Sequence, residues 1–278
     1  MPKFTTPNTW LITGTSRGMG REMVEQLLRR GDTVIATLRN PDDLADLADH
    51  YGDALTTERL DVTDTAALRE AVDRAFATHD RIDVVASNAG YGVFGTAEDL
   101  TDEQVDAMIA TNLTASIQLA RTAVGHLRRQ GGGTLVQMSS MGGHLSFPGF
   151  SLYHVTKWGI EGFYDALAQE VEPFGIRTVL VAPGVVRTGF FDAAPRVPVS
   201  APYVGGPADR PAPTLEEMVD SQEKTVAAIL RAADAEDPPR RLVLGSDAWQ
   251  LVTDALTDRL AEVTAQRENA ATADLTTP

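Results

Sequence analysis

A glycine-rich turn near the N-terminus constrains the fold more than any other feature of the sequence. The apolar run Trp10–Thr13 leads into Gly14-Thr-Ser-Arg-Gly18-Met-Gly20, and residues 21–30 follow with apolar side chains at helical spacing. Glycine allows a tight turn, and the amides at a helix N-terminus attract phosphate. A strand, a glycine turn and a helix in this order predict a dinucleotide-binding unit. A plain turn is the alternative. The predicted cofactor contacts in this turn are Gly14, Ser16, Arg17, Gly18, Met19 and Gly20.

Segments with strand and helix character alternate along the rest of the chain. We expect further strands at 33–38, 55–60, 84–87, 134–138, 177–182 and 241–244. We expect helices from Pro41 and at 64–79, 101–127, 151–171 and 214–233, the third opened by a capping box from Thr101 to Gln104. This order predicts an α/β protein with a Rossmann-type, doubly wound parallel sheet of about seven strands. We expect residues 1–265 to form a single domain and 266–278 a flexible tail.

A second pattern joins Tyr153, Lys157 and Ser140. Residues four apart on a helix lie on one face, with their Cβ atoms about 5–6 Å apart. The Lys157 ammonium is therefore expected beside the Tyr153 phenol. A neighbouring cation lowers the pKa of a phenol, and a phenol tuned toward neutrality can act as a general acid or base. The ordinary alternative is a tyrosine packed inward beneath the lysine stem.

Further motifs occur in a fixed order around these residues: Asn88-Ala89-Gly90, Asn112 and the segment from Pro183 to Thr188. Together with the glycine turn, Ser140 and the Tyr153/Lys157 pair, they resemble the short-chain dehydrogenases/reductases. The glycine spacing is that of the single-domain branch of this family, and the resemblance runs from about residue 8 to residue 190. Each motif is modest, but six in register over two thirds of the chain make the resemblance specific.

The resemblance implies roles for four catalytic residues. Tyr153 would exchange a proton with the substrate oxygen, and Ser140 would orient that oxygen. Lys157 would lower the tyrosine pKa and bind the nicotinamide ribose. Asn112 would hold a water that links Lys157 to solvent, although an asparagine that satisfies backbone groups at a helix irregularity has the same geometry. Ser139 would face away from the site, because neighbouring side chains of a strand point to opposite faces.

The resemblance also predicts the cofactor. Family members that select NAD carry an acidic residue at the end of the second strand, where this chain has Leu38. Arg39 follows directly, and with Arg17 it favours the 2′-phosphate of NADP(H) over NAD(H). Alternatively, these arginines pair at the surface with Asp42 or Asp43. The remaining cofactor contacts implied are Asp61, Val62, Asn88, Ala89, Gly90, Tyr153, Lys157, Pro183, Gly184, Val186 and Thr188. Asp61 could equally be a helix-start residue.

The expected activity is that of an NADP(H)-dependent ketone or aldehyde reductase, reversible as an alcohol dehydrogenase. By resemblance, residues 190–213 form a lid over the substrate. Aromatic side chains are expected at the pocket wall and would suit an apolar substrate; they are Tyr91, Phe94, Phe147, Phe150, Phe190 and Phe191. The alternative is a non-catalytic NADP(H)-binding sensor or scaffold with the same fold.

Composition excludes several other classes. The net charge of −15 argues against affinity for nucleic acid or anionic membranes. Without cysteine there is no disulfide or thiolate metal site, and the five histidines show no metal-ligand spacing. No apolar run approaches the length of a membrane span or signal core, so we expect a cytoplasmic protein. The resemblance implies a homodimer or homotetramer. We assign no catalytic role to His144 or His154.

Overall fold

The chain folds around one seven-stranded parallel sheet. The computed structural model describes residues 7–211, 213–214 and 216–275. The sheet order is β3-β2-β1-β4-β5-β6-β7, and every adjacent pair is parallel. The strands are β1 Thr9–Thr13, β2 Thr33–Leu38, β3 Leu55–Arg59, β4 Val84–Ser87, β5 Gly133–Met138, β6 Ile176–Pro183 and β7 Arg241–Leu244. The order reverses between β1 and β4, so a crevice is expected there at the carboxyl ends of the strands. The predicted fold class is confirmed.

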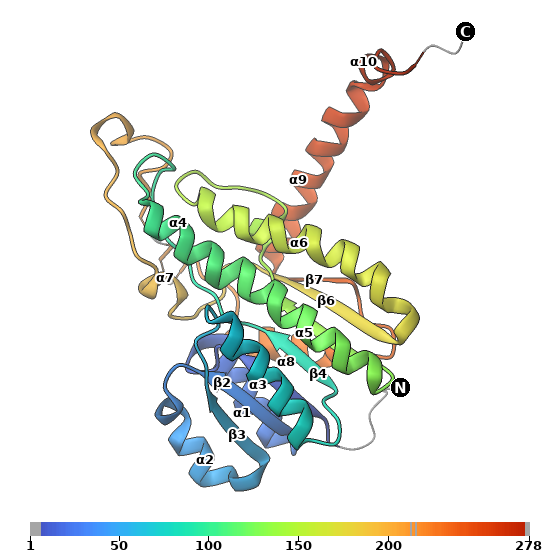
Figure 1. The fold of residues 1–278 in the computed structure, drawn as a ribbon. Coiled ribbons are helices and arrows are strands. Elements are labelled where there is room, and N and C mark those ends of the chain that lie inside the picture. Colours follow the sequence, from blue (N-terminus) through green and yellow to red (C-terminus); the bar gives the residue numbers. More distant parts are fainter. Residues whose placement is uncertain (1–6, 212, 215, 276–278) are drawn as a thin grey trace.

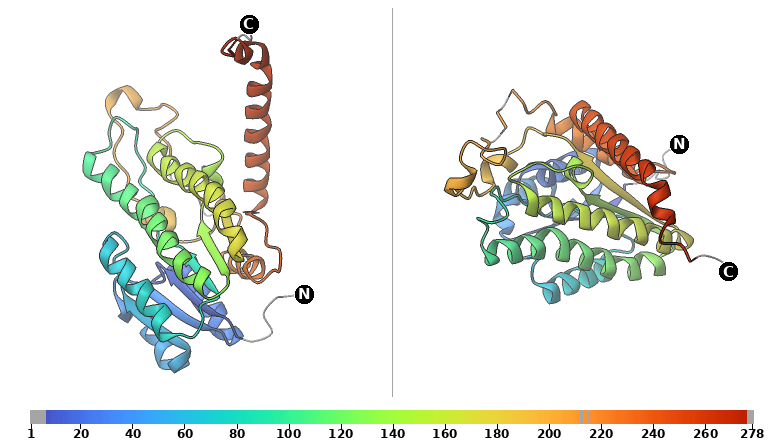
Figure 2. Two further views of the ribbon diagram at one scale, coloured as in Figure 1. Left: turned by 45° about the vertical axis from the view of Figure 1, so that its right-hand side comes forward. Right: turned by 90° about the horizontal axis from the view of Figure 1, so that it is seen from above.

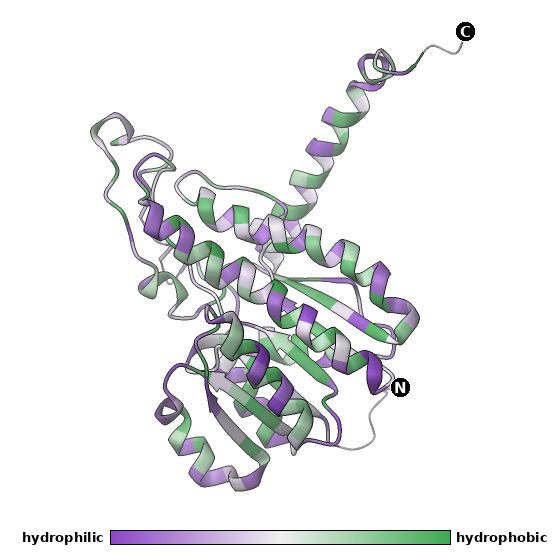
Figure 3. Ribbon diagram, viewed as in Figure 1, coloured by the Kyte–Doolittle hydropathy of each residue, from purple (hydrophilic) through white to green (hydrophobic). Residues whose placement is uncertain are grey.

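Helices cover both faces of the sheet (Figure 1). One face carries α1 Gly18–Arg30, α2 Ala45–Tyr51 and α8 Gln222–Ala233, and the other carries α3 Thr65–Thr78, α5 Ala115–Arg129 and α6 Ser151–Val171. Each layer buries its own apolar cluster, centred on Met23 and Ile229 on the first face and on Leu119 and Tyr164 on the second. The inner strands are mostly apolar in Figure 3, whereas the edge strand β3 carries mostly polar residues. Burial on both faces is typical of parallel sheets in α/β proteins.

The long helix expected over 101–127 contains a local irregularity. Thr101 caps α4 Asp102–Met108 through the predicted capping box, and Ile109–Thr114 then forms a π-helical turn before α5 begins. A π-turn inserts an extra residue into the helix and often marks a functional position. Asn112 lies within it.

The helix predicted from residue 214 starts later than expected. It begins at Gln222, because the Ser221 hydroxyl caps it by accepting a hydrogen bond from the Lys224 amide at 3.3 Å. The start at 214 was therefore wrong. The segment after Pro41 is also tighter than expected, since it opens as the 3-10 turn Pro41–Leu44 before α2.

The C-terminal part of the chain leaves the body of the molecule. Helix α9 Ser246–Ala265 projects away from the sheet and is followed by the short α10 Arg267–Ala271, within the segment predicted to be flexible (Figures 1 and 2). Residues 276–278 lie outside the described residues. The lid segment contains α7 Phe190–Ala193 and the 3-10 turn Ala201–Tyr203. Among the described helices, none is long and apolar enough to cross a membrane.

Candidate active site

The glycine turn is packed too tightly for side chains. Gly14 and Gly18 have φ values of 72° and 57°, in the left-handed region that favours glycine. A Cβ on Gly14 would lie 2.7 Å from Ala89 Cα, and one on Gly20 would lie 2.2 Å from the Gly14 carbonyl oxygen. The side-chain amide of Asn88 fixes the turn by donating a hydrogen bond to the Gly14 carbonyl oxygen at 2.8 Å. Helix α1 starts at Gly18 without a side-chain cap, so its first amides are available to an anion.

The end of β2 carries no acidic side chain. Leu38 is buried, whereas Arg39 and Arg17 are exposed. Among the described residues, neither arginine forms an ion pair with Asp42 or Asp43. Two cations therefore lie on the side where the ribose of a dinucleotide would be expected.

Asp61 has the geometry of a turn residue. Its Oδ1 accepts hydrogen bonds from the Thr63 amide at 3.0 Å and the Thr63 hydroxyl at 2.7 Å. These bonds lower the pKa of Asp61, and the charge of Arg39 lowers it further. Asp61 does not start the following helix, since Asp64 is the N-cap of α3 and accepts from the Ala67 amide at 2.9 Å. Arg39 lies within electrostatic range of Asp61.

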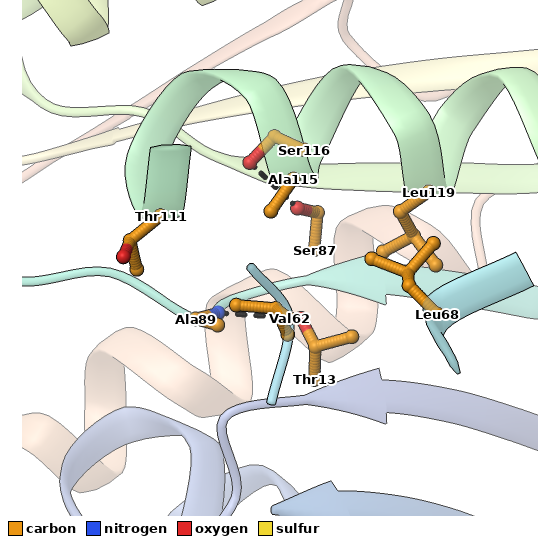
Figure 4. A pocket seen from close by; sticks show the side chains of 9 residues that line it. All are labelled: Thr13, Val62, Leu68, Ser87, Ala89, Thr111, Ala115, Ser116 and Leu119. Carbon is orange, nitrogen blue, oxygen red and sulfur yellow. Dashed lines mark hydrogen bonds between the residues drawn. The ribbon is translucent and has the colours of Figure 1, made fainter. Parts of the chain in front are cut away.

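Val62 lies at a small pocket between the ends of β1 and β4 and the start of α5. The residues around it are shown in Figure 4; they are Thr13, Val62, Leu68, Ser87, Ala89, Thr111, Ala115, Ser116 and Leu119. The Ala89 amide donates to the Thr13 hydroxyl at 3.3 Å, and Ser87 donates to Ser116 at 3.0 Å. The pocket therefore brings Val62 and Ala89, two predicted cofactor contacts, to the crevice at which the strand order reverses.

Ser140, Tyr153 and Lys157 meet at the carboxyl end of β5. Ser140 follows this strand in an extended conformation, and its hydroxyl accepts a hydrogen bond from the Gly142 amide at 3.0 Å. Tyr153 and Lys157 are both buried on α6, where the Lys157 Nζ donates to the Met138 carbonyl at 2.9 Å and lies 5.4 Å from the Tyr153 ring centre. The Ser140 side chain lies close enough to the Tyr153 phenol to lower its pKa. The three predicted side chains therefore share one site.

The electrostatics of this site differ from the expectation. Burial raises the pKa of Tyr153 to about 12, although the hydrogen bond from Ser140 lowers it. Burial also lowers the pKa of Lys157 to about 8, against the attraction of Glu161. The expected tuning of the phenol toward neutrality is thus wrong for this structure, because loss of hydration opposes charge on both groups. At neutral pH the phenol keeps its proton.

Asn112 links the π-turn to the loop after β4. Its Oδ1 accepts from the Tyr91 amide at 3.0 Å, and its Nδ2 donates to the Tyr91 carbonyl at 2.8 Å. A longer bond of 3.4 Å reaches the Thr156 hydroxyl. These contacts match the alternative in which the side chain satisfies backbone groups, and the role in holding a water stays a prediction.

The segment after β6 closes the crevice on its other side. Gly184 donates to the Leu244 carbonyl at 2.9 Å, and the Val185 amide donates to Asp247 Oδ2 at 2.9 Å. The Thr188 hydroxyl accepts from the Phe190 amide at 3.3 Å, so it lies where the lid begins. Pro183 ends the strand, and Val186 pairs with Asp220 in an isolated bridge. The predicted cofactor contacts from Pro183 to Thr188 therefore lie directly before the predicted lid.

The family follows from a comparison with known proteins. A family model described as short chain dehydrogenase matches residues 8–196. The chain belongs to this family. It is 37% identical over 244 residues to the oxidoreductase BOA17 of Botryotinia fuckeliana, with 86% of this chain and 89% of that protein covered. The family resemblance inferred from the sequence is confirmed, and the protein is an oxidoreductase of this family.

Solved structures share the fold over nearly the whole chain. A short-chain dehydrogenase from Streptomyces avermitilis superposes with a TM-score of 0.87 at 33% identity, covering 97% of this chain and all of the other. A short-chain dehydrogenase from Burkholderia cenocepacia, in complex with NADP, superposes with a TM-score of 0.75 at 21% identity and covers 98% of each chain. The second likeness concerns the fold alone.

An aromatic column extends from the tyrosine of this short-chain dehydrogenase to the lid. Tyr153 stacks on Phe150 and Phe150 on Phe94, each pair with ring centres 4.3 Å apart. The Arg196 guanidinium caps the column 4.2 Å from the Phe94 ring centre. Phe190 packs edge-on against Tyr153 at 5.8 Å. The sequence predicted the aromatic residues of the column but not Arg196. Arg196 reaches the Phe94 ring because the backbone of Phe94 pairs with residues 195–197 as in a short strand.

A pair of carboxyl groups lies at the foot of the lid. The Asp220 carbonyl accepts from the Arg187 amide at 2.9 Å and so joins the segments before and after the predicted lid. Asp220 Oδ2 and Asp247 Oδ1 are both buried, and neither accepts a hydrogen bond from another described residue. A proton on one of the two carboxyl groups would let it donate to the other. Burial and the neighbouring Asp247 raise the pKa of Asp220 to about 6. No motif in the sequence marks this pair, since its members lie 27 positions apart.

Replacing Asp220 with asparagine is expected to stabilise the protein at pH 7.5. The folded state holds a proton on Asp220 that the unfolded chain releases, so the stability contributed by this group falls as pH rises from the ordinary pKa of 3.8 through about 6, and is lost above that. The amide of Asn donates to Asp247 at every pH. A net hydrogen bond of about 1 kcal/mol corresponds to a rise in Tm of about 2–4 °C for a domain of this size. Thermal melts at pH 7.5 and 4.5 should show the larger gain at pH 7.5. The exposed Asp237→Asn is the control, and equal gains at both pH values would contradict the shared proton.

Proposed function

We propose that this chain is an NADP(H)-dependent reductase of apolar ketones or aldehydes that also runs in reverse as an alcohol dehydrogenase. One observation carries the proposal. The hydroxyls of Ser140 and Tyr153 lie within interaction distance of each other at the carboxyl end of the sheet, where the glycine turn also lies. Two hydroxyls that meet in this way can contact one reacting oxygen, as reduction of a carbonyl requires.

The residues present fit a bound NADP(H). Gly14 and Gly20 have no room for a Cβ because the turn packs against Ala89 and Asn88, whereas Gly18 has open space over it, as close approach of a pyrophosphate requires. Arg17 and Arg39 are exposed beside the end of β2, and Leu38 leaves no carboxylate there to bind a ribose hydroxyl. The NADP complex of the Burkholderia neighbour supports the same choice. The glycine turn would hold the pyrophosphate, Arg39 and Arg17 the 2′-phosphate, and Thr188 the nicotinamide carboxamide.

When bound, NADPH supplies the hydride for the carbonyl carbon. The protein's own groups then act on the oxygen. Ser140 orients and polarises the carbonyl, and Tyr153 donates its proton to the developing alkoxide. A phenol whose pKa is raised by burial keeps this proton at neutral pH, which favours the direction of reduction. Lys157, charged below a pKa of about 8, would stabilise the phenolate that remains.

Aromatic walls support an apolar substrate. Phe150 and Phe190 both contact the Tyr153 ring, and a Cβ on Gly92 would come within 3.1 Å of each of them. A site lined by aromatic rings with two hydroxyls as its polar groups suits an apolar body with one oxygen. Assembly into a homodimer or homotetramer stays a prediction of the family resemblance, and a location in the cytoplasm stays a prediction from the sequence.

A panel of ketones and aldehydes, followed through the loss of NADPH absorbance, tests this function. We expect turnover with apolar ketones and little with short polar ones. NADPH binding without turnover of any carbonyl, in either direction, would contradict the proposal and favour the alternative of a binding protein with this fold.

A further inference from the structure

His154 directly follows the proposed proton donor and is buried in the first turn of α6. Its ring centre lies 6.1 Å from that of Tyr153 and 5.7 Å from those of Phe147 and Phe150. The side chain therefore lies between the catalytic helix and the loop of residues 142–150, which we call the substrate loop.

Both nitrogens of His154 bond to the backbone of the substrate loop. The Phe147 amide donates to Nε2 at 2.8 Å, and Nδ1 lies 2.8 Å from the Gly142 carbonyl oxygen. An amide can only donate and a carbonyl can only accept, so Nδ1 carries the hydrogen and Nε2 the lone pair. The two contacts thus define a neutral imidazole in one tautomer.

The two ends of the substrate loop contact the reacting groups. At one end, the Gly142 amide donates to the Ser140 hydroxyl at 3.0 Å. At the other end, Phe150 stacks on Tyr153. The fit at Gly142 is tight, since a Cβ there would lie 2.9 Å from His154 Nδ1. His154 therefore ties a point beside Ser140 to the middle of the loop that ends in the Phe150 wall.

We propose that His154 is a positioning residue that fixes the substrate loop against α6 and thereby sets the apolar wall beside Tyr153. The proposal rests on the proposed reductase function, because it concerns where the carbonyl substrate is held. It differs from a capping role, since His154 bonds to a loop that precedes the helix by several residues. Its action is exerted through Phe150 and Ser140, and it does not itself contact the reacting oxygen.

Protonation would break this arrangement. An imidazolium carries hydrogen on both nitrogens, so Nε2 would meet the Phe147 amide donor to donor. Burial lowers the pKa of His154, and the bond to the Gly142 carbonyl only partly opposes that shift, so the neutral form prevails at pH 7. The surrounding titratable groups are Tyr153 and Lys157 on α6, His144 in the loop, and Arg259 of α9, which donates to the His144 carbonyl. Among the described residues, none of the four hydrogen-bonds the imidazole.

Three substitutions separate the two bonds. His154→Asn keeps a donor near the position of Nδ1, His154→Gln keeps an acceptor near that of Nε2, and His154→Leu keeps neither. We expect KM for the ketone to rise roughly tenfold for Asn and Gln and about a hundredfold for Leu, since each lost bond weakens the fixed wall. The value of kcat and the KM for NADPH should change by less than about twofold. The exposed His50→Gln is the matched control.

Hydrogen exchange gives a readout that does not depend on catalysis. The Phe147 amide should exchange faster in the Asn and Leu variants and remain protected in Gln, with Tm checked for each. In the wild type, kcat/KM for the ketone should fall on acidification, at a pH below the ordinary histidine pKa of 6.5, and this acid limb should be absent from the Asn and Gln variants. A Leu variant with wild-type ketone KM and wild-type protection of 143–150 overturns the proposal. If the wild type reduces no carbonyl, the reductase function fails, and exchange at Phe147 still decides whether His154 fixes the loop.

Discussion

Replacing Tyr153 with phenylalanine is expected to lower kcat for ketone reduction by about 10³-fold while leaving NADPH binding intact. The change removes only the phenol oxygen, and a positioned general acid contributes roughly 10²–10⁴-fold to a rate. Phenylalanine keeps the stacking on Phe150 and the edge contact with Phe190, so the wall of the site should survive. Steady-state rates at saturating ketone measure kcat, and titration of NADPH fluorescence measures cofactor affinity.

Tyr164→Phe is the matched control for this experiment. Tyr164 lies on the same helix and is buried, but its ring packs in the apolar cluster between α6 and the sheet, away from Ser140. We expect wild-type kcat from this variant. If kcat of Tyr153→Phe is unchanged, the proton comes from another group. If both variants lose activity equally, the helix rather than the phenol is responsible.

Local geometry predicted that Tyr153 and Lys157 are neighbours, whereas the meeting of Ser140 with Tyr153 was implied by the family resemblance. Helical spacing places Tyr153 and Lys157 on one face. Strand alternation turns Ser139 and Ser140 apart: the buried Ser139 hydroxyl lies beside Gly143, whereas Ser140 lies close enough to the phenol to lower its pKa. The glycine turn was equally readable, because left-handed φ values and close backbone approach leave no choice of residue.

The charge state of the site could not be predicted in the same way. The spacing of Tyr153 and Lys157 says that they are neighbours, but the pKa of each depends on how completely the fold removes water from it. Here Phe150 and Phe190 pack against the phenol, while the Lys157 ammonium turns to the Met138 carbonyl. Burial therefore dominates, and the phenol remains protonated at neutral pH.

Contacts between distant segments were also beyond the sequence. His154 reads as an ordinary helix residue until the loop from Gly142 folds back over it. Asp220 and Asp247 come together only because the end of the lid and the start of α9 both pack on the segment after β6. The start of α8 at Gln222 rather than at residue 214 has a local cause that was visible, namely the capping hydroxyl of Ser221.

The cofactor preference leads to the second large effect. We expect Arg39→Asp to lower the ratio of kcat/KM for NADPH to that for NADH by at least about 100-fold. A hydrogen bond to a charged group contributes about 1.5–3 kcal/mol, or roughly 10- to 150-fold, and an aspartate would in addition repel the 2′-phosphate. The same carboxylate can accept a hydrogen bond from the ribose hydroxyl of NADH. Kinetics with each dinucleotide at a fixed, saturating ketone measure the ratio.

The position of Arg39 makes this test specific. The preceding Leu38 is buried in the core and carries no charge. In the Arg39→Asp variant, the aspartate at position 39 is therefore the group that changes the charge at the end of β2. Arg231→Asp is the control, because it makes the same change of charge on an exposed side chain near the end of α8. The neighbouring Asp234 accepts a hydrogen bond from Asn8, which lies just before β1, so this control lies at the amino ends of the strands, away from the glycine turn. It should leave the ratio unaltered. If Arg39→Asp also leaves it unaltered, the 2′-phosphate is not held by this guanidinium. If both dinucleotides lose kcat/KM equally, Arg39 holds the adenosine half without reading its 2′ position.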